Sequence, residues 1–270
     1  LVNGNALVAR LLRSALDLGV TLLTDKPASR LLGEGRVSGA QFADGQLIHA
    51  RRGVVLACGG FAHDRQRIAQ LMPHAPDGDQ HYSAAPWENS GDGLRLGEQA
   101  GGLVQATATH AGAWAPVSGG PRSDGRFGHF PHLIDRAKPG FIAVRRDGRR
   151  FVNEADCYHD FMNVLFAATP QGEAPEAWLI CDHAAQRRYG IGWAKPFPFP
   201  TRHYQRCGYL HSGRTLAQLA QRCGIDAAQL QRTVDGFNQH AAQGEDPVFQ
   251  RGASAYNRAQ GEPSQAPNPS

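Results

Sequence analysis

The feature that most constrains the fold is an uninterrupted apolar run, residues 53–58, that ends in Gly59 and Gly60. Such a run is typical of a strand buried on both faces, as parallel strands are when helices cover their sheet. Glycines directly after a strand let another backbone, or the diphosphate and ribose of a cofactor, approach where a Cβ would clash. A plain exit from strand to loop also uses flexible glycines, so this segment alone leaves both interpretations open.

The residues before that run predict a helix, a strand and a hairpin. Apolar positions recur three and four apart through residues 4–18, which indicates an amphipathic helix that Gly19 can end in a left-handed conformation. Residues 20–24 are predicted as a short strand of a parallel sheet. An Asp-Gly turn at residues 44–45 predicts a β-hairpin over residues 36–50. This order of elements favours an α/β domain with a small antiparallel excursion.

The composition changes near residue 107, where glycine, proline and aromatic residues cluster and periodicity is lost. Beyond this loop-rich stretch the patterns predict a strand–turn–strand, a helix, a buried strand and a pair of helices (residues 140–153, 160–168, 177–182, 215–224 and 226–237). The segment from residue 260 is rich in Pro, Gln and Ser and is predicted to be disordered or a linker.

Charge and cysteine usage exclude several function classes. The net charge is only +4, with Lys and Arg scattered among Asp and Glu, so no nucleic-acid surface is expected. The one basic cluster, residues 145–150, is better explained as an exposed turn between apolar runs. The cysteines form no CxxC pair, which argues against disulfides or a zinc site and favours reduced thiols in a cytoplasmic protein. No run approaches the about 18–20 apolar residues that cross a bilayer.

Two further motifs set charged groups beside glycines. Glycines flank Asp92 within residues 89–94 and free the chain to present a carboxylate or backbone amides at a helix start, as a cofactor's polar rim requires. On spacing alone, an ordinary helix with a glycine C-cap is the favoured explanation. In residues 148–154, Arg149, Arg150 and Glu154 could line a cleft or support a proton path, although structural ion pairing is favoured.

Taken together and in this order, the motifs resemble those of the FAD-dependent oxidoreductases related to fumarate reductase flavoproteins. The resemblance is strongest to the 3-ketosteroid dehydrogenase branch, and it covers nearly the whole chain. The segments that carry it are residues 4–8, 56–61, 90–93, 138–140, 148–154 and 244–252.

The resemblance implies an α/β fold with α+β character: part of a Rossmann-like FAD-binding domain plus an inserted substrate-capping domain. The boundaries it implies are residues 1–104 for the partial FAD-binding domain, 105–259 for the capping domain and 260–270 for the tail. A Gly-x-Gly-x-x-Gly diphosphate loop does not occur in the sequence. The chain is therefore expected to be an internal fragment that neither binds FAD tightly nor is active by itself.

The resemblance also assigns residues to the cofactor. Ala57, Gly59, Gly60 and Asp92 occupy the positions that lie against FAD in the family. The expected reaction is dehydrogenation next to a carbonyl of a small apolar substrate, such as a steroid, with hydride transfer to the flavin.

A tyrosine suits the proton step of such a reaction, because a nearby positive charge can lower a phenol's pKa. Tyr189 and Tyr204 are the predicted catalytic tyrosines, with Arg187 as the neighbouring cation, and Tyr158 is a further candidate. Packing without catalysis is the alternative for each tyrosine. His110, His129 and His132 are expected to be solvated loop side chains.

Two alternatives remain open at this point. An enoate reductase of the fumarate or urocanate type would need a cationic pocket, but residues 133–139 do not reproduce the Glu and Arg that fumarate reductases carry there. Gln186 stands near the position of their catalytic arginine. The other alternative is a binding module without flavin and without chemistry.

Overall fold

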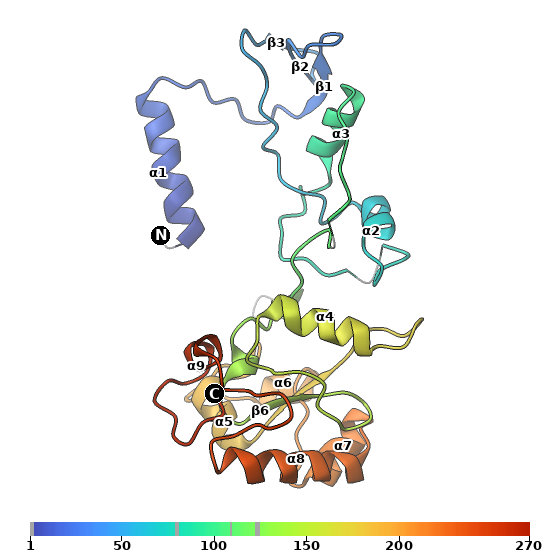
Figure 1. Ribbon diagram of the computed structural model, residues 1–270. Coiled ribbons are helices and arrows are strands. Elements are labelled where there is room, and N and C mark those ends of the chain that lie inside the picture. Colours follow the sequence, from blue (N-terminus) through green and yellow to red (C-terminus); the bar gives the residue numbers. More distant parts are fainter. Residues whose placement is uncertain (1–2, 79–80, 109, 122–124) are drawn as a thin grey trace. The chain divides into compact units, whose positions relative to one another are not determined.

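The computed structural model describes residues 3–78, 81–108, 110–121 and 125–270. By the contacts within it, the chain divides into a first unit, Leu1–Asp64 with Pro86–Thr107, and a second unit, Arg65–Ala85 with Ala108–Ser270. Both units contain helices and short strands (Figure 1), which confirms a mixed α/β chain. Among the described residues, no helix is both long and apolar enough to cross a membrane.

The first unit contains a small antiparallel sheet with the strand order β1-β2-β3. Its strands are β1 (Ala28–Leu32), β2 (Gly39–Phe42) and β3 (Leu47–His49). The predicted hairpin is confirmed: Gly45 has a φ of 85°, and the Gln46 N–H donates to the Asp44 carboxylate at 3.1 Å. Helix α3 (Asp92–Gln99) packs against β1.

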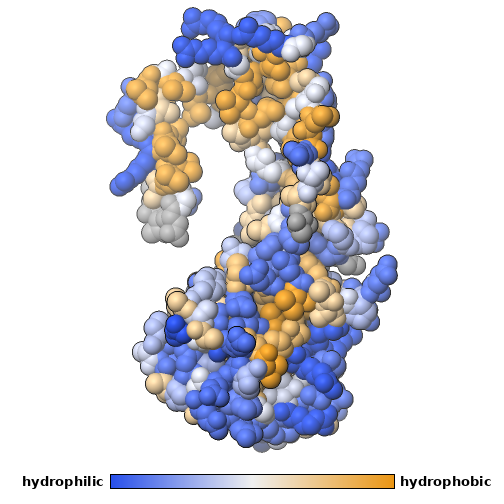
Figure 2. All heavy atoms as spheres, in the orientation of Figure 1, coloured by the Kyte–Doolittle hydropathy of each residue, from blue (hydrophilic) through white to orange (hydrophobic). Residues whose placement is uncertain are grey.

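Helix α1 (Asn3–Asp17) confirms the predicted amphipathic helix at the start of the chain. It ends where Gly19 takes a φ of 73° and the Val20 N–H donates to the Ala15 carbonyl over 2.9 Å. The apolar side chains of this helix are exposed, as the colouring along α1 in Figure 2 shows. They are Leu7, Val8, Leu11, Leu12 and Leu16.

The two predicted parallel strands are not formed, and this part of the sequence interpretation is wrong. Residues 20–24 and 53–58 have no ladder partner, and every strand pair in the described part of the chain is antiparallel. Val55 is 89% exposed. A strand satisfies its backbone N–H and C=O groups only through neighbouring strands, so apolar composition alone does not create one.

The second unit is built around a two-stranded ribbon of β6 (Phe141–Val144) and β7 (Trp178–Cys181). Because side chains alternate along a strand, β6 serves two cores. Phe141 packs with α5 (His183–Tyr189), whereas Ile142 and Val144 pack with the following helix pair. The strand predicted over residues 177–182 is thereby confirmed.

The predicted helix pair is confirmed as α7 (Leu216–Cys223) and α8 (Ala227–Ala241). Gly224 ends α7 in the left-handed conformation with a φ of 67°. The Asp226 carboxylate caps α8 by accepting a hydrogen bond of 2.7 Å from the Gln229 N–H. Leu230 on α8 is completely buried in the core with Ile142.

A second ribbon occupies the stretch that the sequence describes only as loop-rich. Strand β4 (Val117–Pro121) pairs antiparallel with β5 (Phe127–Pro131), so that Ser118 lies opposite Phe130. The remaining elements of this unit are α2 (Arg65–Leu71), η1 (Asp135–Ala137), α4 (Tyr158–Ala168), α6 (Arg202–Arg206) and α9 (Ala255–Gln260). Helix α4 confirms the helix predicted over residues 160–168.

Two segments differ from the sequence expectation. After β6, residues 149–153 form only a single bridge between Val144 and Arg150 instead of a second strand. Residues 260–270 pack within the second unit, where Ser270 is completely buried, although their composition predicts a disordered or linker segment. Gly252 and Gly261 permit this packing, because a Cβ on either would lie under 3 Å from an atom of residues 268–270.

Candidate functional site

Two glycine-containing loops of the first unit lie together. The Gly91 N–H donates to the Gly60 carbonyl at 3.1 Å, and the His63 N–H donates to the Asn89 carbonyl at 3.0 Å. Gly59 has a φ of 83°, and a Cβ on it would lie 2.1 Å from the Asn89 amide oxygen. These contacts join residues 59–63 and 89–92 in one loop cluster that holds the predicted cofactor residues Gly59, Gly60 and Asp92, and Ala57 lies two positions before it.

Asp92 opens α3 and keeps its carboxylate on the surface. The preceding Gly91 is left-handed, with a φ of 80°, and turns the chain into the helix. Arg95 forms an ion pair with Asp92 and also donates to Asp64 at 3.0 Å and to the Ser90 carbonyl at 2.6 Å. The Arg95 guanidinium beside this loop cluster is therefore already shared between two carboxylates.

The open backbone of Gly60 and the surface carboxylate of Asp92 suit the hydroxyl groups of FAD better than its diphosphate. A Cβ on Gly60 would meet nothing within 4 Å, so its exposed backbone is open to a ligand. Sugar hydroxyls can donate to the Asp92 carboxylate and to open backbone carbonyls. A diphosphate would instead face the negative charge of Asp92. The loop cluster therefore fits the hydroxyl-bearing part of the cofactor rather than its diphosphate.

The predicted catalytic residues lie on α5 and α6 of the second unit. Tyr189 and Tyr204 both pack, partly buried, against the core around Phe141. The Tyr189 hydroxyl donates to Glu262 at 3.4 Å. Burial raises the pKa of the Tyr189 phenol, against the lowering effect of Arg188, whereas a proton acceptor would benefit from a lowered pKa.

Arg187, the predicted neighbouring cation, contacts an aromatic ring at the surface. Its guanidinium is exposed and stacks on the Phe197 ring at 4.2 Å from the centroid. Phe197 is itself 63% exposed. The structure gives Arg187 a cation–π partner on the surface.

Four polar side chains that the sequence does not combine form a hydrogen-bonded chain in the second unit. The Tyr209 hydroxyl and the Ser118 Oγ on β4 are 2.7 Å apart. Ser118 Oγ is 2.7 Å from His132 Nε2, and His132 Nδ1 is 2.7 Å from an Asp135 carboxylate oxygen. The Gly192 N–H donates to the same oxygen of Asp135 at 3.0 Å.

The expectation that His132 is a solvated loop side chain is wrong. This residue is only 9% exposed, because it follows β5 and lies beside η1, and both ring nitrogens are hydrogen-bonded. Burial alone would raise the pKa of Asp135, but the hydrogen bond and electrostatic interaction with His132, together with hydrogen bonds from the Gly192 and Arg136 N–H groups, outweigh it and hold the pKa below its ordinary value. The sequence offers only a weak sign of this chain, namely that His132 and Asp135 are three positions apart. Nothing local connects Ser118 and Tyr209, which are 91 positions apart.

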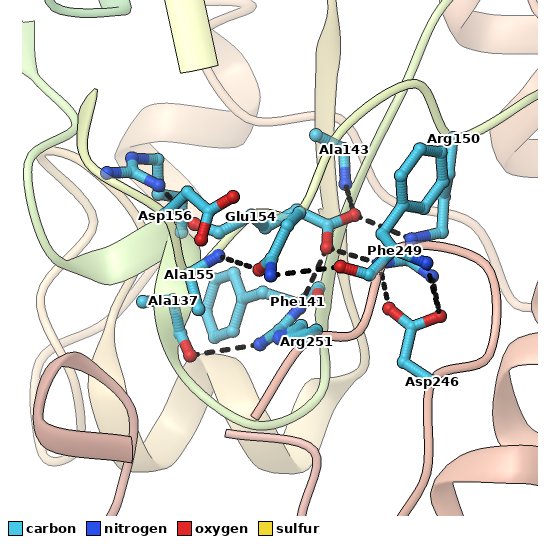
Figure 3. Close-up of polar contacts among 12 residues, drawn as sticks. Ala137, Phe141, Ala143, Arg150, Glu154, Ala155, Asp156, Asp246, Phe249 and Arg251 are labelled. Atoms are coloured by element: carbon cyan, nitrogen blue, oxygen red, sulfur yellow. Dashed lines mark hydrogen bonds and ion pairs between the residues drawn. The ribbon is translucent and has the colours of Figure 1, made fainter. Parts of the chain in front are cut away.

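A buried ionic cluster confirms the structural interpretation of the charges in residues 148–154 (Figure 3). Arg150 donates to both oxygens of Glu154, at 2.8 and 2.6 Å, and to both oxygens of Asp246, at 3.1 and 2.8 Å. Arg251 reaches Glu154 at 3.3 Å, and the Ala143 N–H reaches it at 3.0 Å. Glu154 is completely buried, and its contacts tie segments that are far apart in the sequence together.

Acid is expected to weaken this cluster through Asp246. Burial alone would raise the pKa of Asp246, but the hydrogen bonds and charge of Arg150, together with hydrogen bonds from the Phe249 and Arg251 N–H groups, outweigh it and hold the pKa below 3.8. Because the folded pKa is the lower one, the stabilisation is present well above pH 3.8 and is lost as the pH falls towards the folded value. In urea unfolding, the stability difference between the wild type and Asp246→Asn should shrink below pH 3.8. A stability difference between the two proteins that stays the same at all pH values would contradict this prediction.

Comparisons with known proteins place the chain in a family. The family model described as FAD binding domain matches residues 1–269. A 4-oxocyclohex-2-ene-1-carboxylate 5-dehydrogenase of Sinomonas cyclohexanicum is 40% identical over 271 residues, covering 99% of this chain and 46% of that protein. A 3-oxosteroid 1-dehydrogenase of Mycobacterium tuberculosis is 34% identical over 239 residues, covering 85% of this chain and 40% of that protein.

A solved structure agrees with the sequence relatives. The 3-ketosteroid delta1-dehydrogenase from Sterolibacterium denitrificans, in complex with 1,4-androstadiene-3,17-dione, has a TM-score of 0.78 at 30% identity. The match covers 96% of this chain and 47% of that one. The chain spans about half the length of the curated relatives it matches. Because the family model covers nearly the whole sequence, the chain belongs to the FAD-binding domain family, and the predicted resemblance and cofactor are confirmed.

Proposed function

We propose that the enzyme to which this chain contributes is an FAD-dependent dehydrogenase acting on a carbon–carbon bond next to the carbonyl of a cyclic ketone. The observation that carries the proposal is 40% identity, over 99% of the chain, to a dehydrogenase named for a ring ketone. The similarity in fold to a 3-ketosteroid dehydrogenase supports the same reaction class.

The domain assignment is part of this proposal. Residues 1–104 form part of the FAD-binding domain, residues 105–259 form an inserted substrate-capping domain, and residues 260–270 follow it. The compact unit that contains Ala108–Ser270 supports a separate capping domain. Arg65–Ala85 belong to the same compact unit and are a further candidate part of the cap.

The roles of the chain's own residues follow from their chemistry. Bound FAD supplies a hydride acceptor. Gly59, Gly60 and Asp92 would hold its hydroxyl-bearing part, since they offer open backbone and a surface carboxylate. Tyr189 and Tyr204 are the proposed proton acceptors, supported by their position in the second unit, with Arg187 as the proposed neighbouring cation.

The proposed substrate is a small, largely apolar ring ketone, and two candidates differ in charge. A 3-ketosteroid is favoured by the similarity to the steroid-complexed structure. An oxocyclohexane carboxylate is favoured by the name of the 40% identical relative.

The visible spectrum of the full-length protein, purified without added cofactor, tests the proposal. We expect flavin absorption that is bleached anaerobically by one of the two ketones, and the ketone that bleaches it identifies the substrate class. Bleaching only by reduced viologen, with reoxidation by fumarate, would favour an enoate reductase. A folded, colourless protein that cannot be reconstituted with FAD would leave a binding module without chemistry.

Asp92→Asn in the full-length protein is expected to weaken FAD binding by about tenfold, because a hydrogen bond to a charged group contributes about 1.5–3 kcal/mol. Flavin fluorescence titration of the apoprotein measures this change. Asp17→Asn is the matched control, since Asp17 is also exposed and also pairs with an arginine on its own helix. Equal affinity in the two variants would exclude Asp92 from the cofactor site.

A further inference from the structure

We propose that Ser118, His132 and Asp135 form a further active site, which hydrolyses carboxylic esters without the flavin. Ser118 is the nucleophile, His132 is the general base and Asp135 positions the imidazole. Tyr209 stabilises the charge that develops on the ester carbonyl. This activity lies outside the proposed dehydrogenation, because it uses neither FAD nor a hydride.

The three side chains have the distances and the order of a Ser-His-Asp triad. Ser118 Oγ lies 2.7 Å from His132 Nε2, and His132 Nδ1 lies 2.7 Å from an Asp135 carboxylate oxygen. Both distances fall within about 2.6–3.2 Å, the reach at which a base activates a nucleophile and a third group orients the base. Such a triad is recognised by its geometry and by the roles of its members, and it occurs on unrelated folds.

The hydrogen bonds turn the imidazole into the orientation that a general base requires. Asp135 is a carboxylate, because its pKa lies below the ordinary value, and a carboxylate only accepts. His132 therefore donates from Nδ1, and in the neutral imidazole Nε2 is the acceptor that faces Ser118. The Ser118 hydroxyl donates to Nε2, so the base lies beside the proton that it must remove.

Burial and backbone hydrogen bonds hold the base in place and leave the nucleophile accessible. His132 is 9% exposed, and the Asp135 side chain is 13% exposed. The Gly192 N–H donates to one Asp135 oxygen at 3.0 Å, and the Arg136 N–H donates to the other at 3.1 Å. Ser118 is only half-buried, so it is the end of the triad that a substrate can reach.

Tyr209 supplies a hydrogen-bond donor beside the nucleophile. Because the Ser118 hydroxyl donates to His132, the Tyr209 hydroxyl is the donor in its 2.7 Å hydrogen bond with Ser118. The Trp193 N–H donates to the Tyr209 oxygen at 3.0 Å, which leaves the phenol proton directed at Ser118. When the Ser118 oxygen bonds to a carbonyl carbon, the oxygen that becomes negative is only two bonds away, within reach of the phenol. A donor fixed at that place stabilises the tetrahedral intermediate.

The surroundings of Tyr209 keep its phenol protonated and in position. Burial raises the pKa of the Tyr209 phenol above 10.0, so the phenol is a donor at neutral pH. A Cβ on Gly192 would clash with the Tyr209 oxygen, and a Cβ on Gly120 would clash with its ring. Gly192 also has a φ of 54°, which suits glycine. The two glycines therefore leave the space that the phenol needs beside Ser118.

Aromatic rings around the triad indicate the class of ester. The centroid of the Phe130 ring lies 5.2 Å from that of the His132 ring and 5.2 Å from that of the Trp193 ring. The Tyr204 ring lies 5.6 Å from the Tyr209 ring. Partly buried aromatic rings offer apolar contact area to a ligand. The site therefore suits an uncharged ester with a small apolar acyl group.

The reaction balances in atoms and electrons. Ser118 Oγ bonds to the ester carbonyl carbon while its proton moves to His132 Nε2. The bond from that carbon to the alcohol oxygen then breaks, and the leaving oxygen takes the proton from His132. Water adds to the acyl-Ser118 ester and gives a proton to His132, and Ser118 Oγ takes this proton as the carboxylic acid leaves. The net change converts an ester and water into an acid and an alcohol, without oxidation or reduction.

A fluorophosphonate probe tests the nucleophile directly in the full-length protein. The probe phosphonylates an activated serine, and peptide mass spectrometry identifies the residue that carries it. We expect the folded wild type to be labelled at Ser118 and to hydrolyse p-nitrophenyl butyrate. Ser118→Ala should abolish this labelling and slow the hydrolysis about 100-fold or more. Asp135→Asn, which keeps the size of the side chain but removes its charge, should slow both reactions about 100-fold or more.

Two further variants distinguish a catalytic triad from a structural hydrogen-bond chain. Ser29→Ala removes an exposed hydroxyl that donates to the Gln41 carbonyl, and this variant should be labelled and hydrolyse the ester as the wild type does. Tyr209→Phe should lower kcat for the ester about 100-fold and leave KM nearly unchanged, because the phenol acts on charge that exists only in the transition state.

The labelled position in the wild type decides the question even if a variant fails to fold. A folded wild type that takes up no probe, or takes it up at a residue other than Ser118, would overturn the proposal. Ester hydrolysis that survives in Ser118→Ala would overturn it as well. None of these outcomes depends on the flavin, so bleaching by ring ketones remains the separate test of the proposed dehydrogenase.

Discussion

Replacing Glu154 with Gln in the full-length protein is expected to lower the free energy of unfolding by about 3–5 kcal/mol, the range for breaking a buried ion pair. The change keeps the side-chain volume but removes the charge that faces Arg150 and Arg251. Both arginines are buried, and Arg251 is only 2% exposed. Urea unfolding followed by tryptophan fluorescence measures the effect.

Glu176→Gln is the matched control for that experiment. Glu176 also pairs with an arginine, Arg146, at 3.0 Å, but the two side chains are 44% and 74% exposed. Exposed pairs contribute about 0–1 kcal/mol, so this variant should unfold almost as the wild type does. A similar small loss for both variants would show that the buried cluster adds nothing to stability.

Gly148→Ala is expected to destabilise the protein by about 2–5 kcal/mol, through a strained φ and a backbone clash together. Gly148 has a φ of 76°, and an added Cβ would lie 2.7 Å from the Leu230 nitrogen and 2.8 Å from the Asp226 carbonyl oxygen. Both atoms belong to the backbone at the start of α8. The clash can therefore be removed only if the turn that contains Gly148 moves away from this helix. That movement would break the 2.7 Å hydrogen bond from Thr233 to the Gly148 carbonyl.

Gly172→Ala isolates the conformational part of this effect. Gly172 has a comparable φ of 86°, but an added Cβ would meet nothing within 4 Å. Its substitution should therefore cost only about 1–2 kcal/mol, the usual penalty for a left-handed residue with a side chain. Equal losses at the two sites would mean that the turn yields freely and that the contact with α8 does not constrain it.

Local patterns in the sequence predict much of what forms locally. The apolar spacing of α1, the Asp-Gly turn of the β2–β3 hairpin and the helix pair α7–α8 all follow from residues within a few positions of one another. Gly224 ends one helix and Asp226 caps the next because each acts on its own turn of backbone.

The strands are predicted less well, because a strand depends on its partners. Residues 53–58 are apolar enough for a buried strand, yet they form no ladder in the described part of the chain. Conversely, β4 and β5 pair along their whole length although their glycine-rich sequence suggests loops. Hydrogen bonds between strands are non-local, so composition cannot supply them.

Of the two candidate sites, one can be recognised from local motifs and the other is formed only by residues far apart in the sequence. The motifs around Gly59, Gly60 and Asp92, taken in order, identify the family and its cofactor from the sequence alone. The hydrogen-bonded chain from Tyr209 to Asp135 is a product of tertiary structure, because folding brings Ser118 and Tyr209 together across 91 positions.

The sequence by itself determined the helices, the turns, the family and the cofactor, since each depends on short patterns that act within their own segment or recur in relatives. Only the tertiary structure decided that Glu154 would meet Arg251, 97 positions away, and that His132 would be buried with both ring nitrogens bonded. Hydrogen bonds and ion pairs between distant segments depend on where the backbone places each group, and burial decides how strongly they act.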